Sequence, residues 1–165
     1  MEKALAIANF FITLGVEREC PPTQMKLQKL VYFAHGWHLG LYDQPLIEET
    51  FQAWKYGPVI PSLYLKFRDY GTFPIKQVGT IAALTADMKI THLIPPIKNF
   101  QNLKPFLTKI QDVYGKWNGT QLSALTHQPD TPWSQVRKDY PEDTKNIPIP
   151  NDLLRDYFKR KANES

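Results

Sequence analysis

The segment TQMKLQKLVYFAHGWHLGLYDQPLIEETFQAWKYGPVIP, from Thr23 to Pro61, begins with a run that is apolar on nearly every helical face. Spacings of three and four residues put six side chains on one face of a helix, namely Leu27, Leu30, Val31, Ala34, His38 and Leu41. The other faces carry Tyr32, Phe33, Trp37 and Leu39. A helix that is apolar all round is buried among other elements. The segment therefore predicts a buried central helix, with the hydroxyl of Thr23 as its N-terminal cap.

Two further elements are predicted within and just beyond this segment. The aromatic stretch Phe51 to Tyr56 favours a short extended segment. Val59 to Tyr70 is predicted to be a second helix, because Pro61 suits a first helical turn and Gly71 stands where a left-handed cap would be.

Three sequence blocks, LQKLVYFAHGWHLGLY, AWKYGPVIPSLY and LSALTHQPDTPW, carry a family resemblance. In this combination the chain resembles the Panacea (SocA-like) family, which includes prophage-encoded proteins called GepA. The family-like blocks span about residues 5–71 and 105–140, whereas 72–104 is a variable excursion and 151–161 a terminal helix. The residues that match the motifs, which we interpret as structural, are Leu27, Gln28, Lys29, Leu30, Tyr32, Trp37, Trp54, Tyr56, Gly57, Pro58, His127, Pro132 and Trp133.

The resemblance implies an antitoxin-like domain that binds and neutralises a cognate protein toxin encoded nearby. The SocA branch also implies a second mode, in which the domain is an adaptor that delivers its toxin to a protease or unfoldase. The resemblance does not imply catalysis, and it does not identify the toxin. One alternative is a phage- or prophage-encoded regulator that binds a host protein, and another is an uncharacterised hydrolase that uses His127.

Length and composition predict one domain covering residues 1–165. With 42% hydrophobic residues, the chain can bury a substantial core, and no repeat or composition shift marks a second domain. We expect a mainly α fold, with about six or seven helices around the central one and a small β element. The 13% aromatic content suits either a dense core or an interface with aromatic anchors.

The charge pattern favours a protein partner over a nucleic acid. The formal net charge is +4, but the 20 cationic residues are scattered and mostly accompanied by acids. The densest cluster lies in the terminal helix, which is a common way to complement a helix dipole, and consists of Arg155, Lys159, Arg160 and Lys161. The single cysteine, Cys20, excludes an internal disulfide and fits a reducing cytoplasm.

The N-terminal run Ala4 to Val16 is predicted to be a helix that docks on the core, not a targeting segment. Met1-Glu2-Lys3 has no net positive side-chain charge and no small-residue cleavage site follows. At about 13 residues the run is also shorter than the roughly 20 that span a bilayer, so no membrane association is expected.

Five residues are candidates for partner binding, namely Lys26, Lys29, Lys55, Tyr56 and Arg68. Lys26 stands at the third position of the central helix, where a cation opposes the helix dipole and would be relieved by an acidic partner. An ordinary solvated lysine is the alternative for Lys26 and Lys29. The block from Trp54 to Pro58 is either an edge strand that covers the central helix or an exposed docking edge.

Residues 72–100 are interrupted by prolines and Gly79, and only Met88 to Ile94 has the alternation of a short strand. This excursion either encodes partner choice or connects two elements. After it, Pro105 is predicted to start a helix with a stripe formed by Phe106, Ile110, Val113 and Trp117.

That helix is expected to end at Asn118-Gly119, with Thr120 as the cap of the next short helix. Asp130 or Thr131 would cap the helix that starts at Pro132. A proline-rich link then leads to a terminal helix with Leu153, Leu154, Tyr157 and Phe158.

The histidines and glycines offer structural explanations, and we expect no metal site, no cofactor and no catalytic centre. His38 falls on the apolar stripe and is predicted to be a hydrogen-bonded core histidine, an explanation that extends to His35. His127 ends a short helix, where its ring can bond the exposed carbonyls. Gly36 and Gly40 lie inside the central helix and predict that another element approaches its backbone closely.

Overall fold

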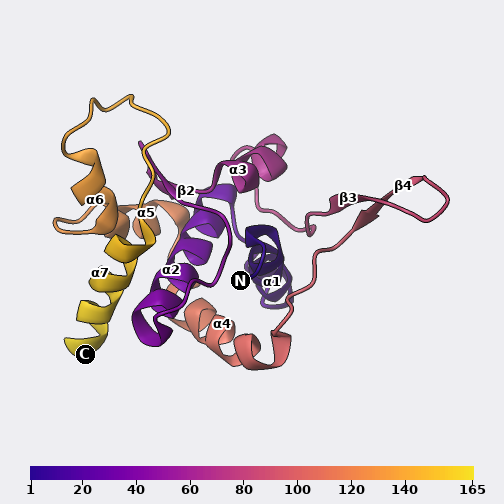
Figure 1. The fold of residues 1–165 in the computed structure, drawn as a ribbon, viewed down its shortest axis with the longest axis horizontal. Coiled ribbons are helices and arrows are strands. Elements are labelled where there is room, and N and C mark those ends of the chain that lie inside the picture. The colour runs from indigo at the N-terminus through magenta and orange to yellow at the C-terminus, as the bar shows by residue number, and fades with distance from the viewer.

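Helix α2 (Gln24–Tyr42) runs through the middle of the molecule, as the computed structural model of residues 1–165 shows (Figure 1). Around it stand α1 (Ala4–Glu17), α4 (Phe100–Tyr114), α5 (Gly119–Thr126) and α7 (Asn151–Asn163). The remaining elements are the short helices α3 (Pro61–Phe67), η1 (Arg68–Tyr70) and α6 (Pro132–Arg137), and the strands β1 (Gln52–Trp54), β2 (Gly57–Val59), β3 (Ile81–Leu84) and β4 (Ile90–Leu93). The expected mainly α fold with a small β component is confirmed.

The burial of α2 confirms the central helix, although its exposed face differs from the expected one. Residues 26–36 are all buried. Leu41, expected on the buried stripe, is 51% exposed, and His38 is only half-buried. At the C-terminal end the buried residue is instead Leu39, and Gly40 beside it contacts Phe158 of α7. Thr23 caps the helix as predicted, since its Oγ1 accepts from Lys26 N.

Helix α7 makes the most extensive contact with α2, and two glycines permit it. A Cβ added to Gly36 would lie 2.1 Å from Cε2 of Phe158, and one added to Gly40 would lie 2.7 Å from the backbone carbon of Phe158. No side chain fits at either position without movement of α7. The predicted close approach at Gly36 and Gly40 is therefore confirmed.

The core histidine of α2 is His35, and the prediction for His38 is wrong. His35 is fully buried, with Nε2 2.9 Å from Oδ1 of Asn151, and its Nδ1 accepts from Ile47 N. His38 instead places Nδ1 2.7 Å from Gln44 O on the exposed side. The helical stripe identified the wrong histidine because α7 covers the side of α2 that carries His35.

Helix α1 forms from Ala4 as predicted, and its buried face packs on α2. Its Asn9 is buried and exchanges two hydrogen bonds of 2.8 Å with the backbone of Gly79. This pair attaches the excursion 72–104 to the N-terminal helix.

Strands β1 and β2 form an antiparallel hairpin whose turn is Lys55-Tyr56. Gly57 follows the turn with φ of +113°, a conformation that favours glycine. The segment predicted to be extended, Phe51 to Tyr56, is therefore a strand only as far as Trp54, and its last two residues form the turn. Val59 belongs to β2, so the predicted helix begins at Pro61 and continues through the 3-10 turn η1.

The excursion carries a second hairpin that projects from the body of the molecule (Figure 1). Its β4 confirms the strand predicted between Met88 and Ile94, whereas β3 was not predicted. The Ala-rich composition of β3 gives little strand signal. The pairing aligns Leu84 with Ile90, and both are exposed.

The helix predicted to start at Pro105 needs two corrections, in its first residue and in its buried face. Helix α4 begins at Phe100, so Pro105 lies inside it and not in its first turn. Its buried side includes Leu103 and Leu107, whereas Val113 and Trp117 are exposed. Helices tolerate such a proline where the carbonyl four residues earlier faces solvent, and Gln101 is exposed.

Two further helix caps are set by side chains. Asn118, expected to end α4, caps α5 through a reciprocal capping box with Gln121, so Thr120 is not the cap. Thr131 caps α6, which confirms one of the two predicted alternatives.

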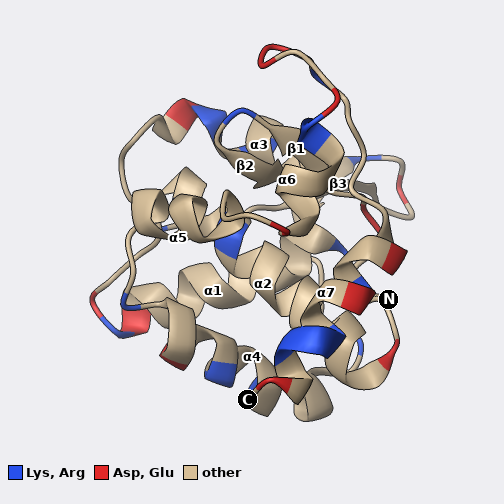
Figure 2. Cartoon of the chain, turned by 90° about the vertical axis from the view of Figure 1, so that its left-hand side faces the viewer, with Lys and Arg blue, Asp and Glu red and all other residues tan.

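Charged residues of both signs are interspersed over the face that α5, α2 and α7 present (Figure 2). In the terminal helix, Arg155 pairs with Asp43, Asp152 and Asp156. The cationic cluster there is thus partly neutralised. No helix combines the length and the apolar character needed to cross a membrane.

Candidate functional site

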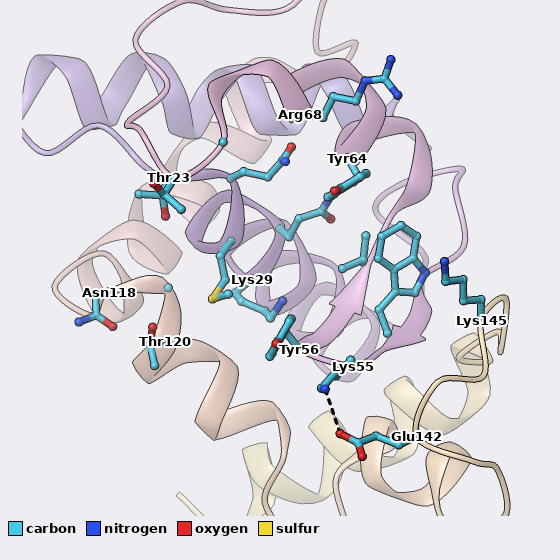
Figure 3. A pocket seen from close by; sticks show the side chains of 18 of the residues that line it. Thr23, Lys29, Lys55, Tyr56, Tyr64, Arg68, Asn118, Thr120, Glu142 and Lys145 are labelled. Atoms are coloured by element: carbon cyan, nitrogen blue, oxygen red, sulfur yellow. Dashed lines mark ion pairs between the residues drawn. The ribbon is translucent and has the colours of Figure 1, made fainter.

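A cleft of about 970 Å³ opens between the first turns of α2 and α5, the β1–β2 hairpin, the α3–η1 segment and the loop 138–146 (Figure 3). Four of the five partner-binding candidates line it, namely Lys29, Lys55, Tyr56 and Arg68. They come from three elements that are separate in the sequence. The fold therefore brings these four residues to one place, which spacing alone did not predict.

Lys29 forms part of the cleft floor, and it is only 1% exposed. Its Nζ donates to the carbonyl oxygen of Pro58 at 3.2 Å, and no carboxylate pairs with it. Burial lowers the pKa of Lys29 to about 7, because the charged form is poorly solvated there. Lys29 is therefore not the solvated lysine that the sequence allowed.

Gly57 covers Lys29 closely. A Cβ added to Gly57 would lie 2.6 Å from Cε of Lys29 and 2.8 Å from Oγ1 of Thr126. Glycine is thus required at this motif position for two reasons, namely the positive φ and the close contact with Lys29 and Thr126. It allows the hairpin to lie directly on the lysine.

Gln28 ties the floor of the cleft to the start of α3. Its Nε2 donates to Ile60 O at 3.1 Å, and its Oε1 accepts from Ile60 N at 2.9 Å. This reciprocal pair satisfies both backbone groups of a buried residue. The structure thus gives a structural explanation for the motif residue Gln28.

The N-terminal ends of α2 and α5 meet at one side of the cleft. A Cβ on Gly119 would lie 3.0 Å from both Lys26 N and Cβ of Met25, so the two ends are in contact. Neither helix has an acidic residue in its first turn. Two positive helix ends therefore face one region, and neither helix supplies a compensating acid of its own.

Lys26 is the candidate that the structure places outside the cleft. It is buried, and its Nζ donates to Gly115 O at the end of α4. The amine therefore complements the negative end of α4, which explains a cation in the first turn of α2. The solvated alternative is wrong for Lys26 as well.

The rim of the cleft is exposed and carries both charges and aromatic rings. Tyr56 is 62% exposed at the hairpin turn, and the rings of Trp54 and Tyr64 lie 5.1 Å apart on one wall. Lys55 forms an ion pair with Glu142 at 3.2 Å, which joins the hairpin to the loop 138–146 (Figure 3). Glu142 raises the pKa of Lys55 through this hydrogen bond and its charge.

Arg137 holds the loop in place and was not identified from the sequence. The side chain is buried, and its guanidinium donates to the carbonyl oxygens of Ala53, Pro141, Glu142 and Thr144. A buried arginine with four main-chain acceptors fixes the position of a loop that lacks secondary structure. No sequence spacing signals such a role, because the acceptors are backbone atoms.

Trp133 and His127 attach the hairpin to α6 and α5. Trp133 Nε1 donates to Trp54 O at 2.7 Å. The ring of His127 lies between two main-chain oxygens, with Nδ1 2.6 Å from Ser123 O and Nε2 3.0 Å from Lys55 O. Both ring nitrogens thus lie within hydrogen-bonding distance of main-chain oxygens, which supports the structural interpretation of His127.

No three His, Cys, Asp or Glu side chains come close enough together to form a metal site. Cys20 is exposed and unpaired with another cysteine.

The protruding β3–β4 hairpin forms a second exposed surface. Its apolar residues Leu84, Met88 and Ile90 are each at least 66% exposed. Single exposed apolar residues are common, but here three stand together at the end of one projecting element.

The fold and the cleft define a small helical domain that is wrapped around one buried helix. Residues 27–134 match the family described as "Antitoxin SocA-like, Panacea domain", and the chain belongs to that family. A curated relative, "Antitoxin SocA" of Caulobacter vibrioides (strain NA1000 / CB15N), is 30% identical over 133 residues, which are 81% of this chain and 69% of the relative. No solved structure matches the chain.

Family membership confirms the resemblance seen in the sequence. The motif residues from Leu27 to Trp133 all fall within the matched residues. They lie in α2, in the β1–β2 hairpin, at the end of α5 and in α6. Four of them line the cleft, namely Gln28, Lys29, Trp54 and Tyr56.

Proposed function

We propose that this chain is an antitoxin that neutralises a protein toxin by binding it directly in the cleft above Lys29. The observation that carries the proposal is the convergence of Lys29, Lys55, Tyr56 and Arg68 on that cleft in a member of an antitoxin family. Bound there, the domain masks the surface of the toxin that acts on its target. The partner is then a protein, and no cofactor takes part.

The composition of the cleft suits protein recognition. Tyr56 and the Trp54–Tyr64 pair provide aromatic anchors of the kind that dominate binding energy at interfaces. The exposed cations Lys55, Arg68 and Lys145 would accelerate encounter with a partner of opposite charge. The anchors thus provide affinity, and the charges select the partner.

A growth assay tests this function. Each gene adjacent to the one that encodes this chain is induced alone and together with it, and any rescued pair is copurified. We expect one neighbour to arrest growth and the chain to restore it while forming a stoichiometric complex. If none of the neighbours is toxic and nothing copurifies, the antitoxin proposal is wrong, and capture of a host protein by a phage-encoded regulator replaces it.

Variants of the chain locate the binding surface in the same assay. Tyr56→Ala removes an exposed ring inside the cleft, whereas Tyr140→Ala removes one outside it. We expect Tyr56→Ala to weaken the complex by about 2 kcal/mol, roughly thirtyfold, because truncated aromatic anchors cost that much. Equal effects of the two variants would place the toxin elsewhere on the surface.

The β3–β4 hairpin favours a second candidate function, that of a proteolytic adaptor. An adaptor needs one surface for the toxin and another for the protease or its unfoldase. The hairpin projects away from the body, and three exposed apolar residues stand together near its end. Measuring the half-life of the toxin with the wild-type chain and with Met88→Ser distinguishes the functions. Adaptor activity predicts a longer half-life with the variant at unchanged toxin binding, whereas masking predicts no difference.

A further inference from the structure

The geometry points to an acidic peptide segment as the part of the partner that occupies the cleft, with one of its carboxylates paired with the ammonium group of Lys29. This inference deepens the proposed function, because it names the chemistry that the cleft recognises. It rests on the unpaired lysine at the floor, the two helix ends beside it and the distribution of cations on the rim.

Lys29 lacks both a counter-ion and a full set of acceptors. An ammonium group has three N–H donors, and the structure supplies one acceptor, the oxygen of Pro58. A buried charge without a partner is costly, and a carboxylate would supply both the missing charge and the missing acceptors. The lowered pKa of Lys29 reflects the same deficit. The amine points from α2 toward Tyr56, at the cleft (Figure 3).

The helix ends add a second independent preference for an anion. The backbone N–H groups of Gln24 and Met25 in α2, and of Gly119 and Thr120 in α5, have no acceptor within the protein. All four residues line the cleft. Unpaired N–H groups and two positive helix ends favour negative charge in the adjacent space.

The rim indicates an extended segment and not a single carboxylate. Lys55 stands on the hairpin, Arg68 on η1 and Lys145 on the loop, so the exposed cations lie on different sides of the cleft. A free C-terminus brings one carboxylate, which one cation would satisfy. A stretch with several Asp or Glu residues satisfies Lys29 and the rim together. Glu142 already shows how a carboxylate is held by Lys55.

The depth of Lys29 favours a peptide over a nucleic acid. The negative charge of a nucleic acid is attached to its backbone, so it interacts best with exposed cations along a groove. Lys29 is recessed beneath Gly57 and is only 1% exposed. The side chain of Glu or Asp extends from its own backbone and can enter such a recess.

A binding measurement with defined probes tests the inference. The probe is a fluorescein-labelled, amidated peptide of the sequence Glu-Asp-Leu-Glu-Trp-Asp-Glu. The comparison probes are its Gln/Asn analogue, that analogue with a free C-terminal carboxylate, and a single-stranded oligonucleotide. Fluorescence anisotropy gives the affinity of each probe for the wild-type chain and for the variants. Backbone amide chemical shifts then locate the bound peptide.

Three variants make the result specific. Lys29→Met keeps the length of the side chain and removes its charge. Arg68→Gln changes an exposed rim residue, so we expect the fold to remain intact. Lys109→Met removes the same charge from the exposed surface of α4, outside the cleft. We expect the acidic peptide to bind, Lys29→Met to weaken it at least tenfold, Arg68→Gln to weaken it two- to fivefold and Lys109→Met to leave it unchanged.

Several outcomes would overturn the inference. One is that the acidic and the neutral amidated peptides bind equally well. Another is that the protein prefers the analogue with a free carboxylate or the oligonucleotide. A third is that neither Lys29→Met nor Arg68→Gln changes the affinity for the acidic peptide. The growth assay remains separate. Toxin rescue that survives Lys29→Met unchanged would refute the acidic segment and leave the antitoxin proposal intact. If the peptide binds at Lys29 but the chain rescues no toxic neighbour, the acidic segment stands and the antitoxin proposal is refuted.

Discussion

Phe158 of α7 lies directly on the backbone of Gly36 in α2, so closely that a Cβ on Gly36 would stand 2.1 Å from the phenyl Cε2. The ring also makes edge contacts with Tyr32, Phe33 and Trp37. This contact attaches the C-terminal helix to the central one. It also explains a glycine in the middle of a helix, where glycine is otherwise unfavourable.

Gly36→Ala is expected to destabilise the fold by about 1–3 kcal/mol, because the added methyl group overpacks the contact with Phe158. Helix propensity alone would stabilise the variant by about 1 kcal/mol, so the sign of the change is diagnostic. Urea unfolding followed by tryptophan fluorescence measures it. In a Phe158→Leu background the cost of Gly36→Ala should shrink. A stabilised Gly36→Ala protein would contradict the packing.

Arg137→Met is expected to lower the free energy of unfolding by about 2 kcal/mol or more, because buried carbonyl oxygens lose a charged donor. The loop 138–146 should also become susceptible to limited proteolysis, since Arg137 is what anchors it. Lys138→Met, one residue later and exposed, serves as the control. If both variants resist proteolysis equally, the loop has another anchor.

Stability is expected to fall as the pH is lowered from about 6.5 toward 4, because His35 must remain neutral. Burial lowers its pKa to about 4, while its hydrogen bond to Asn151 acts in the opposite direction and His38 lowers it further. The folded state thus binds fewer protons than the unfolded state in this window. The stabilisation that neutral His35 contributes is complete above pH 6.5. Between pH 6.5 and 4 the free energy of unfolding falls by up to about 1.4 kcal/mol per pH unit.

Urea midpoints measured between pH 7 and pH 4 check the role of His35. His35→Gln should remove much of the pH dependence, at the cost of lower stability at pH 7. The control variant His38→Gln alters a half-buried ring that is hydrogen-bonded to Gln44 O, and it should keep most of the slope, because burial is the largest cause of the lowered pKa of His35. A slope retained in His35→Gln would show that other groups cause it.

Lys29→Met is expected to stabilise the free protein near pH 7, because it removes a buried charge that has no counter-ion. In the wild-type chain the pKa of Lys29 falls to about 7 from 10.5 in the unfolded state. The free energy of unfolding should therefore rise with pH between 7 and 10.5. The variant should lose that rise. Other titratable groups in the cleft are Lys55, Tyr56, Tyr64, Arg68, Glu142, Asp143 and Lys145.

Glu142→Gln is expected to strengthen binding of the acidic probe peptide by up to about fivefold, because it frees Lys55 from an exposed ion pair. The gain should diminish as salt is added. Glu164→Gln breaks an exposed pair with Lys161 outside the cleft and is the matched control. Weaker binding of the peptide to Glu142→Gln would mean that the pair supports the cleft instead of competing for it.

The helical elements could be predicted because their signals are local. The apolar run of α2, Thr23 as its cap and the close approach at Gly36 and Gly40 all follow from short-range patterns. Predictions failed where a local signal had two uses. Asn118-Gly119 can end one helix or start another, and the capping box with Gln121 selected the second.

The candidate site was only partly predictable. Family-like motifs identified Lys29, Tyr56 and Gly57, yet nothing in the spacing showed that Arg68 and the loop carrying Glu142 would join them. The sequence also allowed Lys26 and Lys29 to be solvated, because a lysine gives no signal of its burial. The role of Arg137 was not predictable, because its acceptors are backbone oxygens that any residue could supply.

The order of residues alone was sufficient to define a helical domain around one apolar helix and to reveal its family, because helix periodicity, caps and motif blocks depend on neighbours along the chain. Only the tertiary structure selected His35 over His38 for the core, and it buried Lys29 beneath Gly57 and closed the cleft with the loop that Arg137 holds. These features depend on contacts between distant segments. Their energies come from desolvation and from pairing with backbone atoms, neither of which is encoded in local spacing.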